Sequence, residues 1–383
     1  MEKKEILHWL NPDTDPAPLF ALADRVRRGH VGDGVHLRGL IEFSNHCRRR
    51  CYYCGIRAGN AKVRRYRLTA GEILACARTA ARLGYGTVVM QSGEDPAWGP
   101  AELAGMVGKV KKETGLAVTL SVGEYSKEDY RMLRAAGADR FLLRFETSDR
   151  RLFGMLKPDS DYDDRFRCLA WLKEAGFQVG SGVMAGLPGQ SAESMADDVL
   201  LFKKLELDMV GIGPFIANPD TPLGGAENGT LDLALRMTAL ARIVTVNAHI
   251  PATTAMGSID PQGRQKALRC GANVLMPNIS PAEHRVDYSL YPGKICTGEA
   301  PEQCAGCVDA MLKSLGRERA AGFGHSLKSG SPTEAAGPAG YSPVPQTREP
   351  LRGSLQPFGL EPPSPTGALG EHPAVPAESQ EPL

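Results

Sequence analysis

The sequence repeats one pattern from Val35 onward: a short apolar or β-branched run, a loop, and an amphipathic stretch of about 12 residues. This alternation is typical of consecutive βα units whose strands pair in parallel. Strand-like runs lie at residues 36–43, 87–91, 117–122, 140–145, 179–185, 209–215, 250–255 and 273–276. Helix-like stretches lie at residues 70–83, 100–114, 127–136, 163–175, 191–205, 231–246, 261–269 and 302–315.

Eight such units in about 280 residues predict an α/β fold, a (β/α)8 barrel of the TIM type. In that fold the loops at the C-terminal ends of the strands form the mouth that holds the active site. A doubly wound open sheet has the same alternation and is the alternative. Eight consecutive units without a topological break favour the barrel.

The two ends of the chain do not follow the repeat. Residues 1–33 contain two helix-like patterns separated by a segment with Pro12 and Pro16, and they are expected to form a helical cap before the barrel of residues 34–320. Residues 321–383 are rich in Pro, Gly and Ser, and twelve of the 28 prolines fall after residue 330. Such a composition predicts a disordered tail, because it cannot bury enough apolar surface.

The overall charge excludes one class of function. Lys and Arg number 45 against 44 Asp and Glu, so no global field attracts nucleic acid or anionic lipid. The apolar run near the N-terminus is too short and interrupted for a signal peptide or a membrane span. A cytoplasmic protein is therefore expected.

Three cysteines stand directly after the first strand-like run, as the C-x3-C-x2-C triplet Cys47, Cys51 and Cys54. Thiolates suit iron-sulfur clusters, Zn and Cu(I), and four of them complete an ordinary cubane or tetrahedral site. A triplet that holds a 4Fe-4S cluster leaves one iron open to a small chelating molecule. If that molecule is the methionine part of S-adenosylmethionine (SAM), one electron can cleave the sulfonium to a 5′-deoxyadenosyl radical.

The other cysteines divide into two groups. Cys296, Cys304 and Cys307 form a C-x7-C-x2-C triplet, which is either a second metal site or a set of reduced thiols. The single cysteines are expected to be buried structural thiols: Cys76, Cys168 and Cys270. Nine cysteines in this arrangement do not resemble a disulfide framework.

The first triplet, with Tyr53 before its last cysteine, resembles the radical SAM signature. Further segments resemble the HydE family of FeFe-hydrogenase maturases, at residues 41–45, 91–96, 186–190, 211–215, 251–257 and 291–296. The resemblance covers roughly residues 1–320. It implies a barrel that cleaves SAM reductively and takes part in assembling the diiron subcluster of the hydrogenase, acting on a small cysteine-bound iron species with CO and cyanide.

The resemblance also implies roles for particular residues. It implies that Cys47, Cys51 and Cys54 hold the catalytic 4Fe-4S cluster. The implied SAM contacts are Tyr53, Gln91, Ser92, Gly93, Glu94, Glu146, Arg165 and Met184. The implied substrate contacts are Ser121, Arg140, Thr253, Thr254, Met276, Tyr288 and Tyr291. Cys296, Cys304 and Cys307 would hold an auxiliary 2Fe-2S or 4Fe-4S cluster.

The implied partners are a companion radical SAM maturase, a GTPase scaffold protein and an external electron donor, with the chain itself a monomer. Two other radical SAM enzymes have a related layout, methylornithine synthase and biotin synthase. Because methylornithine synthase is not expected to have the second triplet, that triplet favours HydE. A cluster-binding electron carrier without radical chemistry is the alternative from another class.

Overall fold

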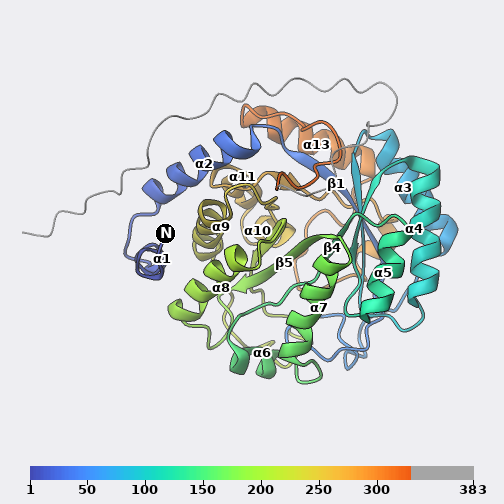
Figure 1. The fold of residues 1–383 in the computed structure, drawn as a ribbon, viewed down its shortest axis with the longest axis horizontal. Helices are drawn as coiled ribbons and strands as arrows, with labels where there is room; N and C mark the ends of the chain where they lie inside the picture. Colours follow the sequence, from blue (N-terminus) through green and yellow to red (C-terminus); the bar gives the residue numbers. More distant parts are fainter. Residues whose placement is uncertain (329–383) are drawn as a thin grey trace, which may run out of the picture. The chain divides into compact units, whose positions relative to one another are not determined.

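The computed structural model describes residues 1–328, in which a curled parallel sheet is surrounded by helices (Figure 1). The sheet has seven strands in the order β6-β5-β4-β3-β2-β1-β7, and all neighbours are parallel. The strands are β1 His36–Ser44, β2 Thr87–Ser92, β3 Ala117–Ser121, β4 Arg140–Leu142, β5 Gln178–Ala185, β6 Met209–Pro214 and β7 Val274–Leu275. The predicted barrel is confirmed, with its strands in chain order around the ring.

The strand predicted at residues 250–255 is wrong. His249 pairs with Met209 and Pro251 pairs with Val274 in single parallel bridges, so this segment joins the two edge strands without being a strand itself. Pro251 has no N–H to donate to a ladder, which prevents regular pairing there. Helix α10 (Thr254–Ile259) then begins inside the predicted strand. The ring therefore closes through a short, irregular connection between β6 and β7.

The helices lie outside the sheet, and their bounds agree with the predicted ones to within a few residues. They are α3 Ala70–Arg82, α4 Pro100–Thr114, α5 Lys127–Ala135, α7 Tyr162–Glu174, α8 Ala192–Lys204, α9 Leu231–Thr245, α11 Gly263–Arg269 and α13 Pro301–Ser314. Thr69 and Ser126 start α3 and α5 with capping boxes, which fix those boundaries in the sequence. Three short helices were not predicted: α6 Arg150–Leu156, α10 and α12 Ala282–Arg285.

The N-terminal residues form the two predicted helices, α1 (Lys3–Leu10) and α2 (Ala17–Val31), which pack against α8 and α9. Arg236 of α9 ties the connection between them to the barrel, because its guanidinium donates to the carbonyls of Trp9, Asn11 and Thr14. No helix within residues 1–328 combines the length and apolar character that crossing a bilayer requires.

Alternate residues of β1 face opposite sides. Ile41 and Phe43 are fully buried in the core between sheet and helices. His36, Arg38 and Glu42 have the other parity and reach polar groups inside the ring. The inside of the barrel is therefore polar at both ends, and Arg38 lies toward the N-terminal end of the strands while Glu42 lies toward the mouth.

A short C-terminal segment, residues 321–328, covers the N-terminal end of the barrel; we call it the strap. The Phe323 carbonyl accepts hydrogen bonds from Thr87 at 2.8 Å and from Arg140 at 2.7 Å. The Gly324 carbonyl accepts one from Arg38 at 3.2 Å. Backbone carbonyls of the strap thus stabilise two buried arginines.

The strap continues across the floor with His325 and Ser326. The His325 ring lies 2.9 Å from Gln178, and its carbonyl accepts from His249 at 2.9 Å. Burial lowers the pKa of His325 to about 4, so the ring is neutral at physiological pH and adds no charge beside the arginines. Ser326 contacts Asp208 through its hydroxyl.

The start of the C-terminal tail and the position of Arg140 differ from the expectations. The tail was predicted to be disordered from residue 321, but residues 321–328 are part of the barrel floor; the rest of that segment lies outside the described residues. Arg140 was expected beside the other substrate contacts. Its guanidinium instead binds Gln178, Thr87 and the strap at the end of the barrel opposite to the cysteine loop. Arg140 begins β4, so its position in the strand places it at the floor.

The strap leads to a prediction about stability. A chain that ends at Ala320 should lose at least about 3 kcal/mol of unfolding free energy relative to a chain that ends at Lys328, because Arg38, Arg140 and His249 lose partners and each unsatisfied buried donor costs about 1–3 kcal/mol. Urea unfolding of the two chains measures the difference. Coincident unfolding curves would show that the strap contributes nothing to the floor.

Candidate active site at the mouth of the barrel

The first cysteine triplet lies on the loop that follows β1, at the C-terminal edge of the sheet. Cys51 is buried, and Cys47 and Cys54 are partly buried. Gly93, just after β2, lies against this loop: a Cβ built on it would stand 2.2 Å from the His46 carbonyl oxygen and 2.6 Å from the Cys47 Cβ. The two loops are in such close contact that only glycine fits at position 93.

This donor set fits a 4Fe-4S cluster. Each thiol of such a site binds a different iron, so the three sulfurs need not converge on one point. Accordingly, no three His, Cys, Asp or Glu side chains in residues 1–328 gather as they would around a single metal ion. Burial raises the pKa of Cys47 and of Cys54, and the neighbouring thiols raise that of Cys54 further. Three adjacent thiolates are thus unfavourable unless a cationic centre binds them.

Glu146 follows β4 in a strained backbone conformation. Its φ is 67°, and the Thr147 N–H donates to the Phe145 carbonyl at 2.9 Å, which makes a γ-turn centred on Glu146. The Tyr53 hydroxyl donates to the Glu146 carboxylate at 3.3 Å, and an Arg144 nitrogen lies 3.1 Å from it. Burial, and then the charge of Glu146, raise the pKa of Tyr53, so the phenol stays protonated. The structure therefore brings two predicted SAM contacts together, at a strained position of the kind common at functional sites.

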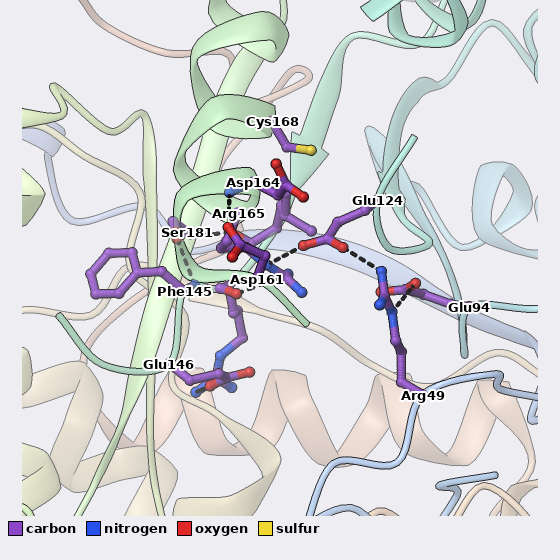
Figure 2. A network of polar contacts seen from close by, with 12 residues as sticks. Arg49, Glu94, Glu124, Phe145, Glu146, Asp161, Asp164, Arg165, Cys168 and Ser181 are labelled. Atoms are coloured by element: carbon purple, nitrogen blue, oxygen red, sulfur yellow. Dashed lines mark hydrogen bonds and ion pairs between the residues drawn. The ribbon is translucent and has the colours of Figure 1, made fainter. Parts of the chain in front are cut away.

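Arg165, on α7, is the centre of a charged network on the rim (Figure 2). Its Nε lies 2.8 Å from Glu124, its Nη1 donates to the Arg144 carbonyl, and its buried Nη2 has no hydrogen-bond partner among the described residues. Glu124 also pairs with Arg49, whose Nε donates to Glu94 at 2.6 Å. The network connects the cysteine loop to α7, and Arg165 retains an N–H for an anionic group.

The inner side of β5 and β6 is lined by glycines. A Cβ built on Gly211 would meet nothing nearer than 3.8 Å, so the interior is open beside this strand. Gly213 faces Thr253, whose hydroxyl oxygen is buried and has no hydrogen-bond partner within residues 1–328. Of these glycines, Gly211 leaves open space, whereas a Cβ on Gly180, Gly182 or Gly213 would come within 3.3 Å of a neighbouring atom. The unsatisfied Thr253 hydroxyl lies beside Gly213.

Other predicted contacts are distributed around the same interior. Gln91 and Ser121 are paired in register on β2 and β3. Tyr288 is fully buried and hydrogen-bonded to Gln91, and Tyr291 is bonded to Ser258. The remaining predicted residues are placed as follows: the Ser92 hydroxyl donates to the Gly93 carbonyl, the Met184 N–H donates to the Glu146 carbonyl, Thr254 begins α10, and Met276 follows β7.

A buried ion pair that was not predicted from the sequence lies inside the barrel. The Lys294 ammonium lies 2.6 and 2.8 Å from the two carboxylate oxygens of Glu42, and Asn278 donates to the same carboxylate at 2.7 Å. Only 10% of the Lys294 side chain and 2% of the Glu42 side chain are exposed. A glutamate inside the apolar run that ends β1 was the available signal, but its partner was not visible in the sequence.

Replacing Lys294 should test how strongly this pair stabilises the fold. Lys294→Met leaves the Glu42 charge buried with Asn278 alone, and breaking a buried pair in this way costs about 3–5 kcal/mol. The double variant Glu42→Gln/Lys294→Met should recover part of that loss. Chemical unfolding measures both, and a single variant as stable as the natural chain would show that water or another group compensates the charge.

The second cysteine triplet joins a loop to α13. Cys304 is buried and Cys307 is exposed three residues later on the same helix, while Cys296 has a φ of 61° in the preceding loop. The neighbouring Cys304 thiol, with nearby Arg264, lowers the pKa of Cys296 to about 6. Two of the three thiols are therefore close enough for one to affect the titration of the other.

Comparison with known proteins decides the family. The chain is 51% identical over 300 residues to the [FeFe] hydrogenase maturase subunit HydE of Thermotoga maritima, a match that covers 78% of this chain and 86% of that protein. The chain belongs to the HydE family. The profile of the Radical SAM superfamily matches residues 41–202. Radical SAM enzymes use a 4Fe-4S cluster and SAM, so this HydE-family chain is an enzyme of that kind.

Methylornithine synthase is a more distant relative of this HydE-family chain. The 3-methylornithine synthase of Methanosarcina acetivorans is 28% identical over 280 residues, covering 73% of this chain and 79% of that one. The crystal structure of methylornithine synthase (PylB) superposes with a TM-score of 0.75 at 25% identity, covering 83% of this chain and 94% of the other. The two families share the barrel, and the higher identity places this chain in the HydE family.

Proposed function

We propose that this enzyme is the HydE of a hydrogenase maturation system and that it acts on a small cysteine-bound iron species carrying CO and cyanide. The observation that carries the proposal is the 51% identity to a HydE over most of both chains. The geometry supports it, because the cysteine loop, the strained Glu146 and the open interior beside Gly211 belong to one end of the barrel.

The cysteines Cys47, Cys51 and Cys54 would hold the 4Fe-4S cluster, which when bound supplies the electron that splits SAM into methionine and the 5′-deoxyadenosyl radical. Gly93 holds the cysteine loop against the end of β2, with Gln91, Ser92 and Glu94 beside it. The free Nη2 of Arg165 suits a carboxylate, and Tyr53, Glu146 and Met184 are grouped where the adenosyl part would lie. Burial of these groups excludes water from a reactive product.

The substrate would occupy the interior between the glycine-lined strands and the residues opposite them. The Thr253 hydroxyl, which has no partner within the described residues, can donate to a cyanide nitrogen or a carboxylate. The other proposed contacts are Ser121, Thr254, Met276, Tyr288 and Tyr291. Arg140 is left out of this set because it belongs to the floor.

The proposal includes an auxiliary site and partners. Cys296, Cys304 and Cys307 would hold a 2Fe-2S or 4Fe-4S cluster, supported by the proximity of the first two thiols. The companion radical SAM maturase would supply the substrate, a GTPase scaffold would accept the product, an external donor would provide electrons, and the enzyme would act as a monomer.

Two assays test the proposal. After anaerobic reconstitution of the enzyme with iron and sulfide, addition of dithionite and SAM should yield 5′-deoxyadenosine. If none forms, the assignment of this site to radical SAM chemistry is overturned. The enzyme should then activate an apo-hydrogenase only together with the companion maturases. Activation that proceeds equally well without this protein would show that it serves another pathway.

A further inference from the structure

The loop that carries the catalytic cysteines is also the most basic segment of the chain. Residues 47–67 contain seven arginines and one lysine, and no Asp or Glu occurs between Glu42 and Glu72. The whole chain has a formal net charge of only +1, so this concentration is local. We call residues 47–67 the basic loop.

The carboxylates that pair with the basic loop lie beneath it. The Arg64 side chain is 68% exposed and its partner Asp287 is 12% exposed, while Lys62 is 77% exposed and Asp220 is 31% exposed. Arg48 and Arg67 are likewise more exposed than the carboxylates with which they pair, Glu94 and Asp95. The surface therefore presents the cations to solvent, although the ion pairs are formed.

Two arginines close to Cys51 have no carboxylate partner among the described residues. Arg57 donates to the carbonyls of Cys51 and Arg50, and its guanidinium lies 5.8 Å from the centre of the Tyr52 ring. Arg50 is exposed, and its guanidinium has no hydrogen-bond or ion-pair partner within residues 1–328, although its backbone N–H donates to exposed Asp159. The positive charge is thus least compensated directly over the cysteine loop.

An apolar spot adjoins these cations. Tyr52 is partly exposed, and its backbone N–H donates to the carbonyl of Leu156 at the end of α6. Met155, the preceding residue, is 51% exposed. A small apolar centre with a charged rim is the arrangement of transient protein interfaces, which bury little area and depend on charge for a fast encounter.

We propose that the basic loop, with Tyr52 and Met155, is the docking surface for a small acidic one-electron carrier protein, which rests on the proposed radical SAM function. SAM cleavage consumes one electron: the carrier is oxidised by one electron, and the sulfur–C5′ bond of SAM breaks to give methionine and the 5′-deoxyadenosyl radical. The carrier must approach Cys47, Cys51 and Cys54 closely, and the basic loop is the segment that holds them. Positive charge there attracts an acidic carrier and accelerates its association.

The test compares two sources of electrons for the reconstituted full-length enzyme. An acidic flavodoxin, reduced by its reductase and NADPH, is one source, and dithionite is the other. Arg50→Glu/Lys62→Glu should lower 5′-deoxyadenosine formation with flavodoxin at least about tenfold at low ionic strength, while added salt should slow the natural enzyme and leave the variant nearly unchanged. With dithionite the two enzymes should agree.

The matched control is Arg25→Glu/Lys112→Glu, the same charge change at exposed positions of α2 and α4 remote from the loop, and it should leave both rates unchanged.

Equal flavodoxin-driven rates in the loop variant and the natural enzyme would overturn the proposal. If the loop variant also fails with dithionite, the single variant Lys62→Glu replaces it in the comparison of electron sources. Lys62 lies eight residues beyond Cys54, so this change is less able to disturb the cysteines. A natural enzyme that fails with dithionite overturns the proposed function instead. A dimer that the loop variant converts to a monomer would assign the surface to self-association.

Discussion

Cys54→Ala should abolish reductive SAM cleavage, whereas Cys304→Ala should leave it nearly intact. Cys54 is one of the three thiols of the loop after β1, and no fourth cysteine is available in that loop to replace it. Loss of a hydrogen bond that only supports a metal ligand lowers metal affinity or activity about 10–100-fold. Loss of the ligand itself should therefore lower 5′-deoxyadenosine formation at least about 100-fold. Cys304 belongs to α13 and to the second triplet, so its removal should affect only iron bound there.

Iron content and 5′-deoxyadenosine yield, measured on the same anaerobic samples, separate the two sites. Cys76→Ala provides the control, since it removes a buried thiol of α3 that belongs to neither triplet. Cys304→Ala should lose iron without losing cleavage, and Cys54→Ala should lose both. An equal loss of cleavage in the two variants would contradict the separate roles of the triplets.

The parts of the fold that were predicted correctly depend on local patterns. Strands such as β1 and β5 are apolar runs that end at a loop, and helices such as α3 and α5 begin at capping boxes, so both are visible within a window of a few residues. The segment at residues 250–255 was mistaken for a strand because its apolar character resembles that of the other strands, although Pro251 prevents a ladder.

The strap was missed for a different reason. Residues 321–328 precede a Pro-rich segment, and its composition was extended to them. The strap is held mainly by backbone carbonyls that accept from Arg38, Arg140 and His249, and any sequence offers such carbonyls. Arg140 was misplaced for the same reason, because its partners come from the strap and from neighbouring strands.

The site shows the same division between local and distant information. The cysteine triplet is contained in eight residues and was recognised from its spacing, whereas the contact between Tyr53 and Glu146 became visible only in the structure. Lys294 and Glu42 are 252 residues apart in the chain, so only the fold reveals the pair. The absence of a hydrogen-bond partner for Arg165 Nη2 among the described residues likewise follows from packing and cannot be predicted from the sequence.

Gly93→Ala should displace the cysteine loop with a single methyl group. The added Cβ would lie 2.2 Å from the His46 carbonyl and 2.6 Å from the Cys47 Cβ, and neither is the end of a flexible side chain. One of the two loops must move, so we expect a loss of about 1–3 kcal/mol in unfolding free energy, typical of an overpacked site. Because Cys47 moves with the loop, iron content at the first triplet and SAM cleavage should both fall, the latter at least about tenfold.

Gly108→Ala is the matched control, because a Cβ built at this position of α4 meets nothing within 4 Å. A glycine in a helix interior is less favourable than alanine by about 0.5–1 kcal/mol, so this variant should be slightly more stable and fully active. Iron analysis, urea unfolding and 5′-deoxyadenosine yield are measured for both variants. A Gly93→Ala enzyme with full iron and full activity would mean that the contact between the two loops does not position the cysteines, and the role of glycine at the end of β2 would then be limited to packing.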